Sequence, residues 1–166
     1  MTSITIPEGV TSIGNEAFEA CGSLTSATIP SSVTSIGYDT FSNCSSLTSV
    51  IIPSSLTSIG LFAFSNCSSL SSIYCEATVP PQCGTQVFQD VDKQVCKLYV
   101  PEGCVNIYKA ADQWSDFLFI SETTNIGFLS TEMSTDVKYY NLLGHKVITP
   151  QKGMIHIQNG KKFLVK

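Results

Sequence analysis

The sequence predicts an α/β to mainly β solenoid in which coils of similar length stack on one another. Three ungapped segments superimpose with a constant period of 23, the difference between Pro7 and Pro30: ITIPEGVTSIGNEAFEACGSL, ATIPSSVTSIGYDTFSNCSSL and VIIPSSLTSIGLFAFSNCSSL. Such a period is typical of repeat architectures, because one repeat is too small to bury its apolar face and stacked repeats share a continuous core. The recurring residues are Pro7, Pro30 and Pro53; Ile13, Ile36 and Ile59; Gly14, Gly37 and Gly60; Phe18, Phe41 and Phe64; and Cys21, Cys44 and Cys67.

Each repeat begins with a predicted strand. Alternation of inward apolar residues with outward ones such as Ser26 and Thr28 is typical of a half-buried strand. The proline that follows ends the strand, because it has no N–H to extend the ladder. The apolar positions follow the leucine-rich-repeat pattern L-x-x-L-x-L, and we therefore expect a leucine-rich-repeat solenoid with parallel strands. They are Leu24, Ala27 and Ile29, then Leu47, Val50 and Ile52, then Leu70, Ile73 and Cys75.

The second part of each repeat is predicted to turn the chain back. Gly37 is expected to allow a backbone turn that a Cβ would hinder. Phe41, Cys44 and Leu47 recur at intervals of three, which is the spacing along one face of a short helical or 3₁₀ turn. Asn43, in an Asn-Cys-Ser triplet that Asn66 repeats, is expected to have a turn role rather than to carry a glycan.

The period breaks after Cys75, where we expect the solenoid to be capped. LYVPEG repeats the strand-then-proline order of TIPEG and predicts one more strand at Lys97 to Val100. Apolar residues at helical spacing predict a short amphipathic helix from Val105 to Trp114, and a solenoid needs such a terminal unit with a polar outer face.

Beyond the cap, residues 121–135 are polar and without period, which predicts a linker. From Asp136 onward the pattern is β, and Asn159-Gly160 is a strong hairpin signal. The sequence therefore predicts leucine-rich repeats at 1–75, a cap at 76–120, a linker at 121–135 and a small antiparallel β module at 136–166.

The repeats resemble the BspA-like leucine-rich-repeat family of bacterial cell-surface proteins, through the pattern I-P-x-x-V-T-S-I-G-x-x-x-F-x-x-C-x-x-L over residues 1 to about 75. The strings YNLLGHKV and NGKKFLVK resemble the C-terminal β modules of exported Gram-negative proteins, some of which are sorting signals. The resemblance implies an extracellular or cell-surface protein that binds host proteins or other cells. Met1 occupies the slot of Leu24, so the sequence starts within a repeat, and no secretory leader is visible.

The charged residues argue against a nucleic-acid partner, and they are unevenly distributed along the chain. All nine basic residues are Lys, so the bidentate Arg fork that suits phosphate and guanine is missing, and we expect no nucleic-acid partner. Residues 1–92 hold seven acidic side chains and no basic one, which gives a net charge of −7 against +3 for the remainder. No run of 18 apolar residues exists, so we expect no membrane span.

The seven cysteines fall into two groups. Those of the repeats are expected to be free and buried, because their parallel side chains are poorly placed for bridging. Among the others, in an exported chain, we favour a disulfide between Cys83 and Cys96, because it would close the irregular loop before the last strand. Four thiols would also suit zinc, but their spacings lack the paired C-x-x-C form.

No constellation for catalysis is visible. His145 and His156 have no neighbouring ligand or nucleophile at a useful spacing, and Cys104 has no obvious base. Paired carboxylates, a nucleophile elbow and a phosphate loop are absent from the sequence patterns. We therefore expect no enzyme, no cofactor and no metal site.

The outward residues of the strands are the candidate binding site. Solenoids commonly bind ligands through such a face, and the change from Thr to aromatic residues places the anchors at its C-terminal end. We predict protein or glycan ligands on host or neighbouring cells, with ordinary strand-facing residues as an equal alternative. The other readings are a scaffold fragment of a longer surface solenoid, and self-association through the N-terminal edge strand. The candidate residues are Thr28, Ile51, Tyr74, Lys97 and Tyr99.

Overall fold

A computed structural model describes residues 2–123 and, further along the chain, 139–140, 146–147, 155–158 and 161–164. The chain divides into two compact units, Met1–Thr124 and Asn125–Lys166. Among the residues that the structure describes, no helix has the length and hydropathy needed to cross a bilayer.

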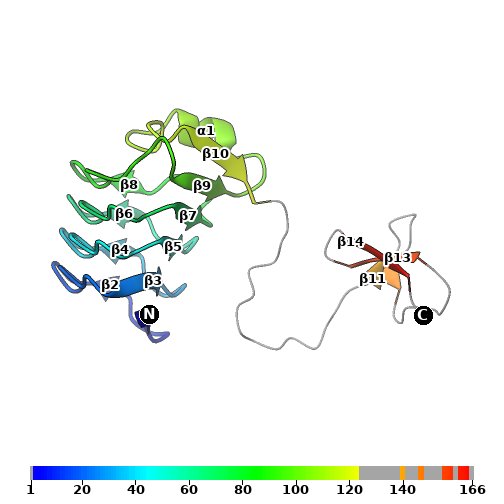
Figure 1. The fold of residues 1–166 in the computed structure, drawn as a ribbon, viewed down its shortest axis with the longest axis horizontal. Helices are drawn as coiled ribbons and strands as arrows, with labels where there is room; N and C mark the ends of the chain where they lie inside the picture. The colour runs from blue at the N-terminus through cyan, green and yellow to red at the C-terminus, as the bar shows by residue number, and fades with distance from the viewer. Residues whose placement is uncertain (1, 124–138, 141–145, 148–154, 159–160, 165–166) are drawn as a thin grey trace. The chain divides into compact units, whose positions relative to one another are not determined.

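The first unit is a solenoid with two parallel sheets (Figure 1). The smaller sheet has the order β2-β4-β6-β8, with strands Ser12–Ile13, Ser35–Ile36, Ser58–Ile59 and Gln82–Cys83. The larger sheet has the order β1-β3-β5-β7-β9-β10, with strands Thr2–Thr5, Leu24–Thr28, Ser49–Ile52, Ser72–Cys75, Lys97–Val100 and Phe119–Glu122. The predicted parallel solenoid with 23-residue repeats is thus confirmed.

The register shows that coiling continues beyond Cys75, where we expected the repeats to end. Ser26 pairs with Ser49 and Ser49 with Ser72, one full period each, while Ser72 pairs with Lys97, slightly more than a period further on. The solenoid therefore accommodates a longer coil without losing the sheet. Strand β10 pairs in parallel with β9, so Ser121 and Glu122 extend the sheet where a linker was expected.

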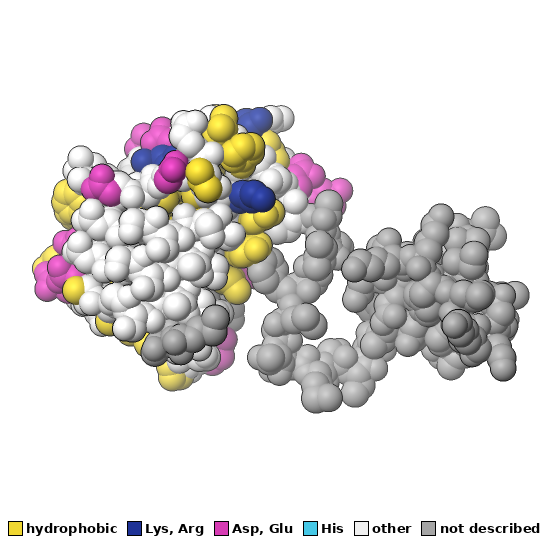
Figure 2. Space-filling model, viewed as in Figure 1, with side chains coloured by type: hydrophobic (Ala, Val, Ile, Leu, Met, Phe, Trp, Pro, Cys, Tyr) yellow, Lys and Arg dark blue, Asp and Glu magenta, His cyan; other side chains and the backbone are white. Residues whose placement is uncertain are grey.

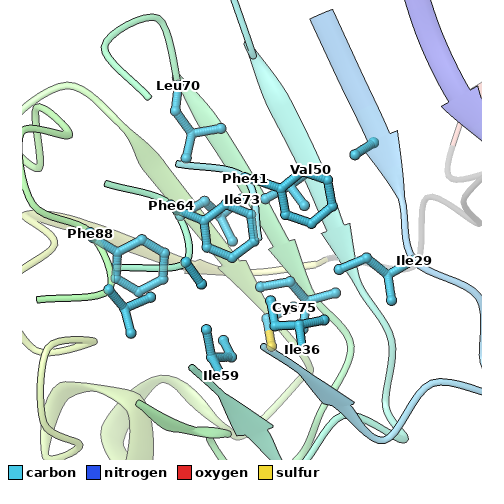
Figure 3. Close-up of a cluster of buried hydrophobic side chains, with 14 of the residues drawn as sticks. Ile29, Ile36, Phe41, Val50, Ile59, Phe64, Leu70, Ile73, Cys75 and Phe88 are labelled. Carbon is cyan, nitrogen blue, oxygen red and sulfur yellow. The ribbon is translucent and has the colours of Figure 1, made fainter. Parts of the chain in front are cut away.

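A file of phenylalanine rings runs through the core (Figure 3). The ring centroids of Phe18 and Phe41 are 5.1 Å apart, those of Phe41 and Phe64 are 5.4 Å apart, and those of Phe64 and Phe88 are 5.8 Å apart. Phe41 and Phe64 are fully buried, whereas Phe18, at the N-terminal end of the file, is half-buried. The expected buried file is confirmed, and Phe88 extends it by a step one position longer than the period, which the sequence comparison missed.

Within the described repeats, residues 2–104, no helix forms, but single turns with 3₁₀-type hydrogen bonds occur at the predicted spacing of three: the Cys44 N–H donates to the Phe41 carbonyl at 3.3 Å, and the Leu47 N–H donates to the Cys44 carbonyl at 2.9 Å. Backbone N–H groups of one coil donate to carbonyls of the next, as from Phe41 to Ala63 at 2.8 Å and from Phe64 to Val87 at 2.9 Å. Asn43 has a φ of 60°, and the same left-handed conformation recurs in the other coils, so a helical run is interrupted after each single turn. The expected turn role of Asn43 and of its equivalent Asn66 is confirmed.

The repeat glycines serve close approach between coils rather than an unusual turn. Gly37, Gly60 and Gly84 lack a positive φ. A Cβ added to any of them would lie under 3.0 Å from backbone atoms of the preceding coil, whereas a Cβ at Gly14 would meet nothing within 4 Å. The expectation that Gly37 allows a special backbone turn is therefore corrected: the residue lets two backbones pack directly against each other.

The only helix in the described residues, α1 (Val105–Lys109), is shorter than the predicted Val105 to Trp114. Gln113 has a φ of 61°, which is incompatible with helix continuation up to Trp114. The apolar side chains nevertheless point into the solenoid, where the Trp114 ring lies edge-on to Phe88 with centroids 5.1 Å apart. Tyr108 and Trp114 are thus buried as the helical spacing predicted, although Trp114 lies in a turn and not in the helix.

Polar side chains of this last segment bind backbone groups of the fourth coil. The Tyr108 hydroxyl donates to the Ala77 carbonyl at 2.7 Å, and the Trp114 indole N–H donates to the Pro81 carbonyl at 2.9 Å. The Gln113 amide oxygen accepts from the Val87 N–H at 2.7 Å, and its NH₂ group donates to the Gly84 carbonyl. In the third coil the equivalents of the two groups that Gln113 binds, the Ala63 N–H and the Gly60 carbonyl, bond each other at 3.3 Å, so the Gln113 amide bridges a pair that is joined directly there.

The cysteines of the described solenoid are all free. Of the three repeat cysteines that were expected to be buried, Cys44 and Cys67 are, but Cys21 in the first coil is exposed. The Cys44 thiol donates to the Phe18 carbonyl at 3.1 Å, and the equivalent contact of Cys67 is 3.2 Å long. The disulfide expected between Cys83 and Cys96 is not formed: Cys83 lies in β8 of the smaller sheet, whereas Cys96 directly precedes β9 of the larger one. Burial raises the pKa of both thiols to about 12.

The second unit contains the strands β11 (Tyr139–Tyr140), β12 (Lys146–Val147), β13 (Ile155–Gln158) and β14 (Lys161–Leu164). They pair antiparallel in the order β12-β11-β13-β14, and Gln158 is opposite Lys161. Asn159 and Gly160, His145 and residues 124–135 of the expected linker lie outside the described residues.

Candidate ligand-binding face of the larger sheet

The larger sheet presents two rows of outward side chains. Alternation along each strand sets them: in β9, Leu98 and Val100 are fully buried, while Lys97 is exposed and Tyr99 is half-buried. Strand pairing aligns Thr5, Thr28, Ile51, Tyr74, Tyr99 and Ser121 in one row, and Ser3, Ser26, Ser49, Ser72, Lys97 and Phe119 in the other. All five residues predicted as a binding site therefore share one face.

The character of this face changes from one end to the other. Hydroxyl side chains make up both rows in the first two strands, whereas larger side chains occur in the last four. The Tyr74 and Tyr99 rings are stacked with centroids 4.7 Å apart and an angle of 8° between planes. We call Ile51, Tyr74, Lys97, Tyr99 and Phe119 the aromatic patch.

Sequence reasoning missed Phe119, which pairs with Lys97 and is 48% exposed. A strand at this position has no leucine-rich-repeat pattern, so no local signal identified it. Two further apolar side chains are exposed just before the last strands, Val95 before β9 and Leu118 before β10. In Figure 2, hydrophobic side chains gather with a Lys side chain on the side of the solenoid where Figure 1 shows β5, β7 and β9.

A hollow of about 570 Å³ lies at the end of the smaller sheet, apart from the aromatic patch. Its lining includes Cys83, Phe88, Asp90, Asp112 and Gln113. Burial is the main cause that raises the pKa of Cys83 to about 12, so the thiol is protonated at neutral pH and is not an activated nucleophile. In the part of the chain that the structure describes, no three His, Cys, Asp or Glu side chains gather closely enough to hold a metal ion.

The parallel sheets, the 23-residue register and the ring file define a leucine-rich-repeat solenoid, a class whose members are typically protein-binding and not enzymes. The chain belongs to the BspA-type leucine-rich-repeat family, whose repeat region matches residues 1–118 in six copies. Proteins of this family are typically surface or secreted proteins of bacteria.

Solved structures of leucine-rich-repeat proteins are similar to this chain. One, from Bacteroides ovatus ATCC 8483, is 28% identical over 72% of this chain and 32% of its own, with a TM-score of 0.48. Another, from T. pallidum, is 23% identical over 58% of this chain and 57% of its own, with a TM-score of 0.42. The chain thus spans about a third of the length of the first protein and somewhat over half of the length of the second. No curated protein gives a significant match.

Proposed function

We propose that this chain is a cell-surface or secreted recognition module that binds a protein ligand on the outward face of the larger sheet. The observation that carries the proposal is the stacked Tyr74–Tyr99 pair on a sheet face that is otherwise lined largely by hydroxyl side chains. Aromatic residues at the centre of a contact are the usual anchors of protein interfaces. The typical location of the family supports an extracellular site of action.

The stacking favours a protein over a glycan. Sugars pack against a free ring face, but Tyr74 and Tyr99 lie face to face at 4.7 Å. The register sets Ile51 and Ser121 on the two outer sides of the pair. We propose that the ligand contacts the ring edges and hydroxyls rather than the ring faces, because edges and hydroxyls suit apolar side chains and backbone groups.

The size of the face limits how the ligand binds. Six strands about 4.8 Å apart span about 24 Å, and a four-residue strand is about 13 Å long, so the face covers roughly 300 Å². A stable protein complex buries about 800 Å² on each partner. The ligand must therefore extend beyond the strands, and the exposed Val95 and Leu118 lie where the aromatic patch continues into the turns.

The test is a binding screen with the purified chain against immobilised extracellular-matrix proteins and a glycan array. The variant with Tyr74→Ala and Tyr99→Ala is compared with the wild type, and Tyr38→Ala, an exposed tyrosine outside the larger sheet, serves as the control. Loss of a hot spot of about 2 kcal/mol weakens protein binding about 30-fold, and the control leaves it unchanged. Equal binding by the double variant, or binding to glycans alone, refutes the proposal.

A scaffold role is the second candidate, and the N-terminal end of the solenoid favours it. Phe18 is half-buried beside an open hollow of about 460 Å³, and β1 is an edge strand of the larger sheet. Edge strands pair readily with another chain or another coil. Sedimentation of the purified chain over a range of concentrations distinguishes the two: self-association without ligand binding supports the scaffold.

Two segments that follow the repeats have further proposed roles. Residues 105–117 are proposed to cap the solenoid, supported by the side-chain hydrogen bonds of Tyr108, Gln113 and Trp114 to the fourth coil. The module at 136–166 is proposed to assist export. Deleting it in the source bacterium and locating the protein by cell fractionation tests this, and unchanged export contradicts it.

A further inference from the structure

Lys97 is placed inside the aromatic patch. On its own strand, Tyr99 is the next outward side chain, and in the adjoining strands Lys97 pairs with Ser72 and with Phe119. Its side chain is exposed. A cation thus stands between two aromatic residues on a surface that we propose to bind protein.

The charges around Lys97 make this position unusual. Residues 2–123 contain eleven acidic side chains and three lysines, yet the two outward rows of the sheet contain no acid. The only ion pair within residues 2–123 joins Lys93 and Asp116, at 4.0 Å. Within the described solenoid, Lys97 and Lys109 are therefore both without an ion-pair partner, although acids are in excess there, and of the two only Lys97 lies in an outward row of the sheet.

We infer that the aromatic patch takes a protein segment that places an apolar side chain against the Tyr74–Tyr99 pair and a single carboxylate beside Lys97. The inference rests on the proposed function of this face. A carboxylate that reaches Lys97 gains a charge-assisted contact which the rest of the row does not offer.

The same charges limit the ligand to one acidic group. The net charge of residues 2–123 is −8, which repels a polyanion as a whole. Screening at physiological salt acts over about 8 Å, so one carboxylate beside Lys97 responds mainly to Lys97, while further acids meet the acidic surroundings. A run of acidic residues is therefore a poorer ligand than one acid next to apolar residues.

The experiment is selection from a phage-displayed library of random linear peptides on the immobilised full chain. Five proteins are compared: wild type, Lys97→Gln, Lys97→Glu, the double variant with Tyr74→Ala and Tyr99→Ala and, as a matched control on α1, Lys109→Gln. Wild type and control are expected to enrich peptides with one Asp or Glu beside aromatic or aliphatic residues. Lys97→Gln is expected to lose the acid preference and to bind the wild-type peptides about 5-fold more weakly, and Lys97→Glu to select Lys or Arg instead.

The outcomes separate this inference from the proposed function. Peptides that need Tyr74 and Tyr99 but show no acid preference overturn the inference and leave the binding face standing. Peptides with runs of acids as the strongest binders overturn the single-carboxylate claim. If no selected peptide depends on Tyr74 and Tyr99, the proposed face is refuted and the inference with it.

Discussion

Replacing Gly84 by alanine tests whether neighbouring coils pack so closely that one added methyl group forces them apart. An added Cβ would lie 2.5 Å from the Leu61 amide nitrogen and 2.9 Å from its Cα. Both are backbone atoms of the preceding coil and have no rotamer through which to move. The control is Gly14→Ala, because a Cβ there meets nothing within 4 Å and the backbone φ is ordinary.

The cost follows from the displacement. Reaching an ordinary contact of 3.4 Å requires the two coils to part by about 0.9 Å, which stretches the 2.8 Å hydrogen bond from the Gly84 N–H to the Ile59 carbonyl to about 3.7 Å. Overpacking costs about 1–3 kcal/mol and each weakened hydrogen bond about 1 kcal/mol, offset by about 0.4–1 kcal/mol from the lost flexibility of glycine in the unfolded chain. We expect Gly84→Ala to lower the free energy of unfolding by about 1–4 kcal/mol.

Urea unfolding followed by tryptophan fluorescence measures this change in the solenoid alone, because Trp114 is the single tryptophan and is buried there. Gly14→Ala is expected to be neutral or to raise the midpoint slightly. Equal midpoints for the two variants would refute the reasoning, because they would show that the coils tolerate a side chain at this position.

Three further predictions concern the proposed cap and the thiols. Gln113→Ala removes the amide that bridges the Val87 N–H and the Gly84 carbonyl and should cost about 1–3 kcal/mol in urea unfolding; a change under about 0.5 kcal/mol contradicts its capping role. Tyr108→Phe removes only a buried hydroxyl and should cost about 1–2 kcal/mol in the same assay. Burial raises the pKa of Cys67 and Cys96 from 9.0 to about 12, so their contribution to stability is complete below pH 9 and is lost as the pH rises toward 12. Unfolding at a series of pH values checks this, and replacing both residues by alanine should flatten the alkaline decline.

The repeat itself was predictable because equivalent residues occupy equivalent places. Pro30, Ile36 and Phe41 each recur one constant period later, and a stacked core is the arrangement that buries all of them together. The sequence comparison did not detect Phe88 because the fourth coil is longer, which places this phenylalanine one position out of register with the period. A fixed-period comparison detects like residues only while the coil length is constant.

Other features depend on contacts between coils that a single repeat does not encode. The spacing of three at Phe41 and Cys44 predicted the single 3₁₀-type turn that is observed, but it did not predict the hydrogen bonds to the neighbouring coil. Gln113 acts through a side-chain amide that bridges two backbone groups, and polar residues in such turns carry no distinctive pattern. Of the binding face, the row positions were predicted, but Phe119 depends on a strand that has no repeat signature.

A double-mutant cycle on the phenylalanine file tests the stacked-coil account most directly. Phe41→Leu, Phe64→Leu and the double variant are compared by urea unfolding, and contact between rings 5.4 Å apart predicts a coupling energy of about 0.5–1.5 kcal/mol. The same cycle on Phe18 and Phe64, which lie two steps apart in the file, should be additive within about 0.5 kcal/mol. Additivity for the adjacent pair, or equal coupling for both pairs, would contradict a core built from like residues stacked coil upon coil.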